Sequence, residues 1–129
     1  MFKIICLTSD KNHHSIFTEV TYEKNDRNGM FLSEQIGAKN FRLRESKVGY
    51  STEWHLAGDP TLIIVQKGIL RITLQNNQHI DFEAGEQFIA SDNLPNNIAF
   101  DNTIHGHKAT VLGEENLMAI HIKLDNWKV

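Results

Sequence analysis

Hydrophobic and polar residues alternate with a period of two along most of this chain, which is the pattern of half-buried β-strands. In residues 40–46, for example, Phe41 and Leu43 alternate with Arg42 and Arg44. No stretch of ten residues carries a helical apolar stripe with capping residues, so no long helix is expected. The pattern predicts strands over residues 2–8, 15–22, 40–46, 62–65, 68–74, 79–83, 86–90, 107–112 and 117–124.

Turn signals separate these apolar segments. Asn76 and Asn77 suit a two-residue hairpin turn, because asparagine tolerates positive φ. Gly85 and Gly113 mark further reversals, and residues 25–29 are predicted to form a loop. Many short strands with turns between them predict an all-β fold, an antiparallel sandwich or barrel.

Residues 62–65 are apolar at every position, which implies cover on both faces of that strand. Burying Leu62 and Ile64 on the outer face would contribute about 1.5–3 kcal/mol each. Either residues 1–35 fold back over this face, or a second copy of the chain packs on it. We expect the second arrangement, a homodimer with sheet-to-sheet packing.

Composition narrows the class of protein. The 129 residues predict a single domain over 1–129, long enough to bury a core without metal or disulfide. Cys6 is the only cysteine, which favours a reducing, cytoplasmic compartment. The apolar run at the N-terminus is too short for a signal peptide or a membrane span, so no membrane partner is expected. Net charge is −3 with both signs interspersed, so nucleic acid is not an expected partner.

One spacing points to a family. Gly49, His55 and Gly68 fall where the first motif of the cupin superfamily (G-x5-H-x-H, three or four residues, E-x6-G) has its glycines and first histidine. This stretch therefore resembles that motif, with two departures. Ala57 stands in place of the second histidine, and Thr61 stands in place of the glutamate.

A second stretch resembles the other cupin motif. Gly85 and Glu86 stand at its Gly-Asp turn, Ser91 replaces its proline, and His107 supplies its histidine after the insertion 93–104. The resemblance covers about residues 40–124 and extends to small bacterial single-domain cupins. It implies an antiparallel jelly-roll β-barrel, with residues 1–39 as N-terminal strands and a loop and residues 40–124 as the barrel core.

The resemblance also raises the question of a metal. Metal-binding cupins hold one ion with three histidines and a carboxylate, and only His55 and His107 map to such positions here. Residues 117–124 place His121 on one face with Leu117 and Ala119, and this face could line the lumen.

Two interpretations of these histidines stay open. His55, His107 and His121 could hold a divalent ion such as Fe, Mn, Ni or Zn, with His105 as an alternative to His107 because the two should face the same way. Alternatively, His107 and His121 are hydrogen-bonded side chains of the lumen.

Other residues carry similar pairs of interpretations. Trp54 offers a surface for stacking on a ligand, or it plugs the barrel end. Arg42 and Arg44 could grip a carboxylate or phosphate, or they belong to a solvated outer face. Asp92 could act as an acid or base near the mouth, or it caps the turn at Asn93.

These observations predict a small-molecule-binding cupin-like protein with its site in the lumen around His55 and His107. The alternative is a metal-dependent enzyme of the isomerase, lyase or dioxygenase type, with His55, His107 and His121 as ligands. A filled structural or sensing dimer is a third hypothesis. The identity of the ligand and the role of residues 93–104 are left open. The predicted ligand-binding residues are Trp54, His55, Thr61, Gln87, His107 and His121.

Overall fold

The computed structural model describes residues 1–127, and these residues contain eleven strands and no helix. No helix long and apolar enough to cross a membrane occurs among them. The prediction of an all-β fold is confirmed, and each predicted strand is present with its ends shifted by no more than two residues. The strands are β1 (Phe2–Ser9), β2 (Ser15–Tyr22), β3 (Asn25–Arg27), β4 (Met30–Leu32), β5 (Ala38–Ser46), β6 (Thr61–Lys67), β7 (Ile69–Leu74), β8 (His79–Phe82), β9 (Gln87–Ala90), β10 (His107–Leu112) and β11 (Leu117–Leu124).

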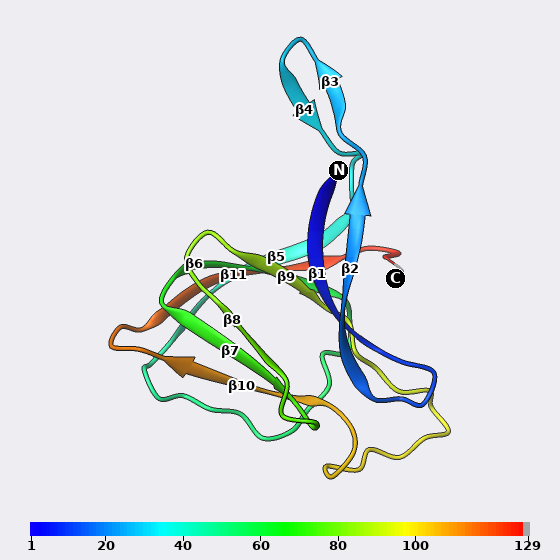
Figure 1. Cartoon of the computed structure of the whole chain (residues 1–129), viewed down its shortest axis with the longest axis vertical. Coiled ribbons are helices and arrows are strands. Elements are labelled where there is room, and N and C mark those ends of the chain that lie inside the picture. Colours follow the sequence, from blue (N-terminus) through cyan, green and yellow to red (C-terminus); the bar gives the residue numbers. More distant parts are fainter. Residues whose placement is uncertain (128–129) are drawn as a thin grey trace.

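Two sheets face each other in the body of the molecule (Figure 1). The larger has the strand order β2-β1-β9-β6-β11-β5, and the smaller has the order β10-β7-β8. Neighbouring strands are antiparallel, except that β1 pairs with β9 in parallel. This arrangement agrees with the jelly-roll barrel that the cupin resemblance implied.

The core lies between the two sheets. Phe82 of β8 stacks on Phe88 of β9, with ring centroids 4.3 Å apart, so one aromatic pair joins the sheets. On β7 and β10, alternate residues are buried, as the period-two pattern requires. The buried apolar residues of this core are Leu7, Ile63, Val65, Leu70, Ile72, Leu74, Phe82, Phe88, Ala90, Ala109, Val111, Leu117 and Ala119.

The segment 50–57 continues the smaller sheet beyond β10. Ser51 pairs with Thr110, and His55 pairs with His107. The main chains of these two histidines exchange hydrogen bonds, at 3.0 Å from His55 N to His107 O and 2.9 Å in the reverse direction. This pairing fixes one wall of the space between the sheets.

Residues 1–22 do not lie across the outer face of β6. Strands β1 and β2 join the same sheet through β9 and extend it sideways. A second, smaller cluster forms on this outer side around the buried residues Cys6, Ile89 and Leu124, with Leu62 packed against it. The alternative to the homodimer, that residues 1–35 fold back over this face, does not hold for β1 and β2, because β1 pairs edge to edge with β9 and β2 pairs with β1.

The sequence predicted a loop over residues 25–29. The structure instead forms part of a hairpin there. β3 and β4 pair as a hairpin that projects from the body in Figure 1. Its turn uses Asn28 and Gly29 at positive φ, and the Gly29 amide donates to Asp26 Oδ1 at 2.8 Å. The apolar residues Met30 and Phe31 after this turn supply the second strand, and they are more than half exposed.

Candidate functional site

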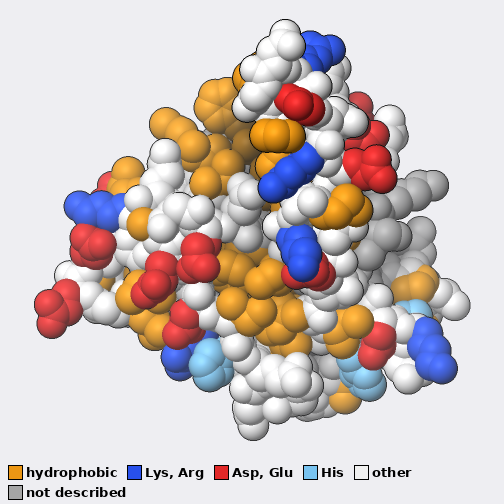
Figure 2. All heavy atoms as spheres, turned by 45° about the horizontal axis from the view of Figure 1, so that its top comes forward, with side chains coloured by type: hydrophobic (Ala, Val, Ile, Leu, Met, Phe, Trp, Pro, Cys, Tyr) orange, Lys and Arg blue, Asp and Glu red, His pale blue; other side chains and the backbone are white. Residues whose placement is uncertain are grey.

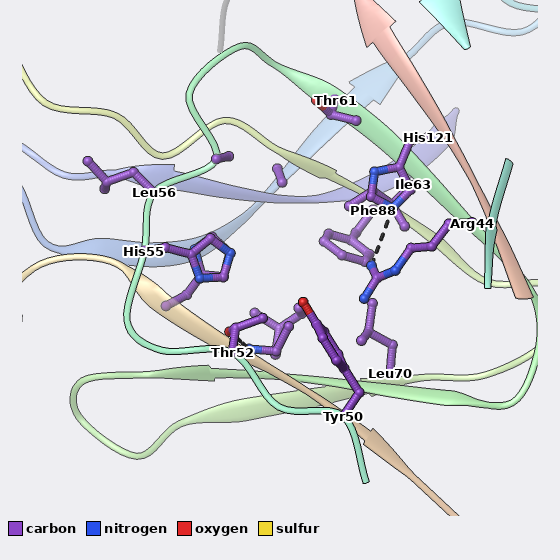
Figure 3. A pocket seen from close by; sticks show the side chains of 15 residues that line it. Arg44, Tyr50, Thr52, His55, Leu56, Thr61, Ile63, Leu70, Phe88 and His121 are labelled. Atoms are coloured by element: carbon purple, nitrogen blue, oxygen red, sulfur yellow. Dashed lines mark hydrogen bonds between the residues drawn. The ribbon is translucent and has the colours of Figure 1, made fainter. Parts of the chain in front are cut away.

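A cavity of about 350 Å³ lies between the two sheets (Figure 3). Strands of both sheets and the segment 50–57 contribute to its wall. The wall combines aliphatic side chains with a few polar ones, and among residues 1–127 it holds no aspartate or glutamate. Its residues are Arg44, Tyr50, Thr52, His55, Leu56, Ala57, Thr61, Ile63, Leu70, Ile72, Phe88, Ala90, His107, Ala109 and His121.

His55 and His107 form one side of this cavity. Their ring centroids are 4.4 Å apart and the rings are tilted by 52°. The backbone pairing of these two residues explains why the side chains meet. Gly106 permits it, since a Cβ at this position would lie 2.6 Å from the His55 carbonyl oxygen.

Asp92 is the buried partner of His107. Its Oδ2 accepts from His107 Nδ1 at 2.7 Å and from the Ser15 hydroxyl at 2.7 Å, while Oδ1 accepts from the Ala57 amide at 2.9 Å. Asp92 is fully buried, and three donors satisfy it as a carboxylate. A carboxylate only accepts, so Nδ1 of His107 carries a proton and Nε2 is the nitrogen left for a ligand.

His55 is oriented by its own segment. Its Nδ1–H donates to the Glu53 carbonyl at 2.8 Å, which leaves Nε2 without the proton when the ring is neutral. Burial lowers the pKa of His55; the Glu53 bond acts in the opposite direction, and His107 lowers the pKa further. Both histidines line the cavity, and with each Nδ1 engaged, Nε2 is the ring nitrogen left for a ligand.

Arg44 and His121 form another part of the wall, across the cavity from His55 in Figure 3. Arg44 donates through a terminal nitrogen to His121 Nε2 at 3.3 Å and through Nε to the Ser46 hydroxyl at 2.9 Å. Burial, and then the charges of Arg44 and Arg42, lower the pKa of His121 to about 4. His121 is thus neutral at pH 7 and accepts from the guanidinium.

These contacts do not fit the predicted metal site. Within residues 1–127, no group of three or more histidine, cysteine, aspartate or glutamate side chains is placed to hold a metal ion. Nε2 of His121 is occupied by the cationic Arg44, which repels a divalent cation. The structure brings His55 and His107 together and leaves His121 paired with Arg44, so the three-histidine ligand set is not assembled.

Of the other predicted ligand-binding residues, Thr61 lines the cavity, whereas Trp54 and Gln87 do not. The Thr61 hydroxyl donates to the Asp59 carbonyl at 2.9 Å. The Lys108 ammonium lies 4.9 Å from the ring centroid of Trp54. Gln87 is exposed and borders a separate groove beside Phe2, because its side of β9 faces away from the core.

His105 does not share the orientation of His107. Its Nδ1 accepts from the Asp101 amide at 2.9 Å, and its ring is buried within the insertion 93–104 and the turn that follows. Gly106, with φ of +83°, interrupts the alternation that would have placed both histidines on one face. His105 therefore stabilises this loop.

Sequence reasoning left Asp92 and Arg44 among open alternatives and did not single out Tyr50 or Thr52 as wall residues. Alternation placed Arg44 and Leu43 on opposite faces of one strand, but it could not tell which face points inward: Leu43 is 73% exposed and Arg44 lines the cavity. Nothing in the sequence pairs Asp92 with His107, since the two are separated by the insertion 93–104.

The chemistry available here is polar recognition and proton transfer. A histidine whose Nδ1–H is fixed by a buried carboxylate presents Nε2 in one tautomer, which is the arrangement of a general base or acid. Whether a proton moves depends on a ligand within reach of Nε2.

No protein-family model and no curated protein matches the chain. Among solved structures, it is similar to a protein with a cupin-2 domain from Shewanella frigidimarina, with 24% identity and a TM-score of 0.43 over 67% of this chain and 76% of that one. It is also similar to the protein NMB1881 from Neisseria meningitidis, with 14% identity and a TM-score of 0.45 over 71% of this chain and 84% of that one. A conserved protein of unknown function from Streptococcus pyogenes, SPY1581, shares 12% identity with a TM-score of 0.45 over 84% of this chain and 98% of that one.

Proposed function

We propose that this protein binds a small molecule in the cavity between its sheets, oriented by His55 and His107. The observation that carries the proposal is the meeting of these two imidazoles on the wall of a 350 Å³ cavity, with each Nδ1 already engaged. A volume of this size is at the lower end of the range for small-molecule sites.

The composition of the wall supports a ligand with both apolar and polar parts. Leu70, Ile72 and Phe88 supply apolar contact area, which contributes most of the affinity of small ligands. The Nε2 atoms of His55 and His107 supply directional contacts. The ligand that fits is small and carries at least one hydrogen-bonding group on the side of these histidines.

The metal-dependent enzyme is the weaker hypothesis, because no three of the candidate side chains converge. If the protein is an enzyme, the Asp92–His107 pair supports proton transfer on the bound molecule instead. A single proton-transferring histidine typically contributes a rate factor of about 10²–10⁴.

The proposal is tested by filling the cavity. Thermal shift against a panel of small carboxylic acids, amides, sugars and aromatic heterocycles identifies molecules that raise the melting temperature. Ala109→Leu places a larger side chain on the cavity wall, and it should abolish the response to any positive compound. Ala99→Leu, at an exposed position, is the matched control and should keep the response. A response that survives Ala109→Leu unchanged would place binding elsewhere on the molecule.

A further inference from the structure

The cavity wall carries one cation that no protein anion neutralises. Within residues 1–127, no carboxylate oxygen lies within 4 Å of the Arg44 guanidinium. Arg71 provides the contrast, since its guanidinium makes two hydrogen bonds to Asp81 at 2.7 and 3.0 Å. Both are arginines on strands of the barrel, but only Arg44 borders the cavity.

The neighbours of Arg44 use only part of its donor capacity. A guanidinium has five N–H groups, and the described contacts occupy Nε with Ser46 and one terminal nitrogen with His121. Both partners are uncharged at neutral pH: Ser46 is a hydroxyl, and the pKa of the His121 ring is about 4. The ring of Tyr50 lies 5.8 Å from the guanidinium carbon, and burial lowers the pKa of Arg44. A half-buried cation with spare donors is costly unless an anion pairs with it.

We propose that Arg44 is the anchor for a carboxylate group of the ligand, so that the protein binds a small organic acid. This inference rests on the proposed function of the cavity and specifies the class of its ligand. A carboxylate accepts two parallel hydrogen bonds from a guanidinium, which fixes both position and angle. Of the residues that the structure describes, Arg44 is the single Lys or Arg in the wall. One positive charge matches a carboxylate better than a phosphate monoester, whose charge is about −1.5 to −2.

The position of Arg44 also orients the rest of the acid. Arg44 and His121 lie across the cavity from His55 in Figure 3, with Tyr50 and Thr52 along the wall between them. A carboxylate on Arg44 therefore places the body of the acid against Leu70 and directs its far end toward His55 and His107.

The test compares acids with their uncharged amides on the unmodified protein. Benzoate and benzamide have the same shape, and so do phenylacetate and phenylacetamide. Calorimetric titration should give dissociation constants about tenfold or more lower for each acid than for its amide. Arg44→Gln should remove this preference, while Arg27→Gln, which deletes an equal charge from the projecting β3–β4 hairpin, should keep it.

A spectroscopic readout covers the case in which Arg44→Gln does not fold. Bound benzoate places a negative charge beside His121 and should raise the pKa of that ring, measured by NMR, whereas benzamide should not. Equal affinity of acids and amides would overturn the inference and leave cavity binding intact. Failure of all four compounds to bind would also overturn it, while the proposed function would then be judged on its own panel. A stronger response to phenyl phosphate than to benzoate would overturn the choice of carboxylate.

Discussion

Asp92 ties together three parts of the chain at the candidate site. Its carboxylate accepts from Ser15 at the start of β2, from Ala57 in the segment 50–57 and from His107 at the start of β10. Its burial is complete, so water cannot replace a lost partner. The orientation of His107, and with it the polarity of the cavity wall, depends on this one side chain.

Replacing Asp92 with asparagine should destabilise the protein by about 2 kcal/mol or more, because an amide NH2 would face a donor and one hydrogen bond would be lost. Urea unfolding measures the change. Asp59→Asn is the control, since Asp59 is exposed and its contact with Lys123 is 3.6 Å long, so this variant should stay within about 0.5 kcal/mol of the parent. Equal losses of unfolding free energy for the two substitutions would show that the hydrogen bonds of Asp92 contribute no more stability than an exposed aspartate does.

His121 predicts a pH dependence of stability. The pKa of its ring is about 4 in the folded chain and 6.5 as a reference value, so between these values the unfolded chain binds a proton that the folded chain does not. Stability should therefore be lost as the pH falls from 6.5 towards 4. His55 acts in the same direction, because its pKa is also lowered. Urea midpoints at several pH values should fall less steeply for His121→Gln than for the parent.

His79→Gln is the control for that series, because His79 is an exposed residue on β8, away from the cavity. It should leave the slope of the parent unchanged. A parent whose urea midpoint is flat between pH 7 and 4 would contradict the buried, neutral state of His121.

At this scale the sequence indicated part of the site. The cupin-like spacing singled out His55 and His107, which do meet. The spacing could not indicate that the Arg44 guanidinium hydrogen-bonds to Nε2 of His121. The two residues are 77 positions apart and come together only through the pairing of β11 with β5. A ligand set inferred from residue type alone missed this hydrogen bond, which takes up Nε2 of His121.

At the scale of elements, the site depends on how the segment 50–57 joins β10. The strands themselves followed from alternation, since period-two burial is a local property. The segment 50–57 has no such alternation, and its pairing with β10 is made by two isolated bridges across more than fifty residues. The parallel pairing of β1 with β9 is equally non-local. Local patterns therefore predicted which residues form strands but not which strands become neighbours.

Gly106 is the point where this pairing is most sensitive. Gly106→Ala combines a φ of +83° with a Cβ only 2.6 Å from the His55 carbonyl oxygen, so the backbone must move. Gly58→Ala has a similar φ of +76° and open space, so it carries only the left-handed conformational cost of about 1–2 kcal/mol. Thermal unfolding should show a clearly larger loss for Gly106→Ala than for Gly58→Ala. Equal losses would mean that close approach of the two backbones is unimportant.

At the scale of the whole molecule, the β5 side of one apolar face is left exposed within residues 1–127. Phe41 and Leu43 on β5 are 68% and 73% exposed, and their partners across the strand pairing are Ile122 and Ile120. Figure 2 shows one face of the molecule, on which hydrophobic side chains, drawn in orange, form contiguous patches between charged ones. The homodimer expected from residues 62–65 stays a prediction, because the sequence shows that a face is apolar but not what packs on it.

Sedimentation equilibrium at micromolar concentration measures this prediction. The parent chain should sediment as a dimer, and the double variant Phe41→Glu, Leu43→Glu should sediment as a monomer, because two charges would be buried in the interface. Phe100→Glu, at an exposed position on the insertion 93–104, should remain a dimer. A monomeric parent would contradict sheet-to-sheet association.

The most direct test of the central claim follows the seven histidine rings by long-range 1H–15N NMR during a titration with benzoate. A ligand held in the cavity should shift the ring signals of His55, His107 and His121 together, with one dissociation constant. His13, His14 and His79 lie outside the cavity wall and should not move. Shifts confined to those outer histidines, or unchanged cavity signals while calorimetry shows that benzoate is bound, would contradict the account.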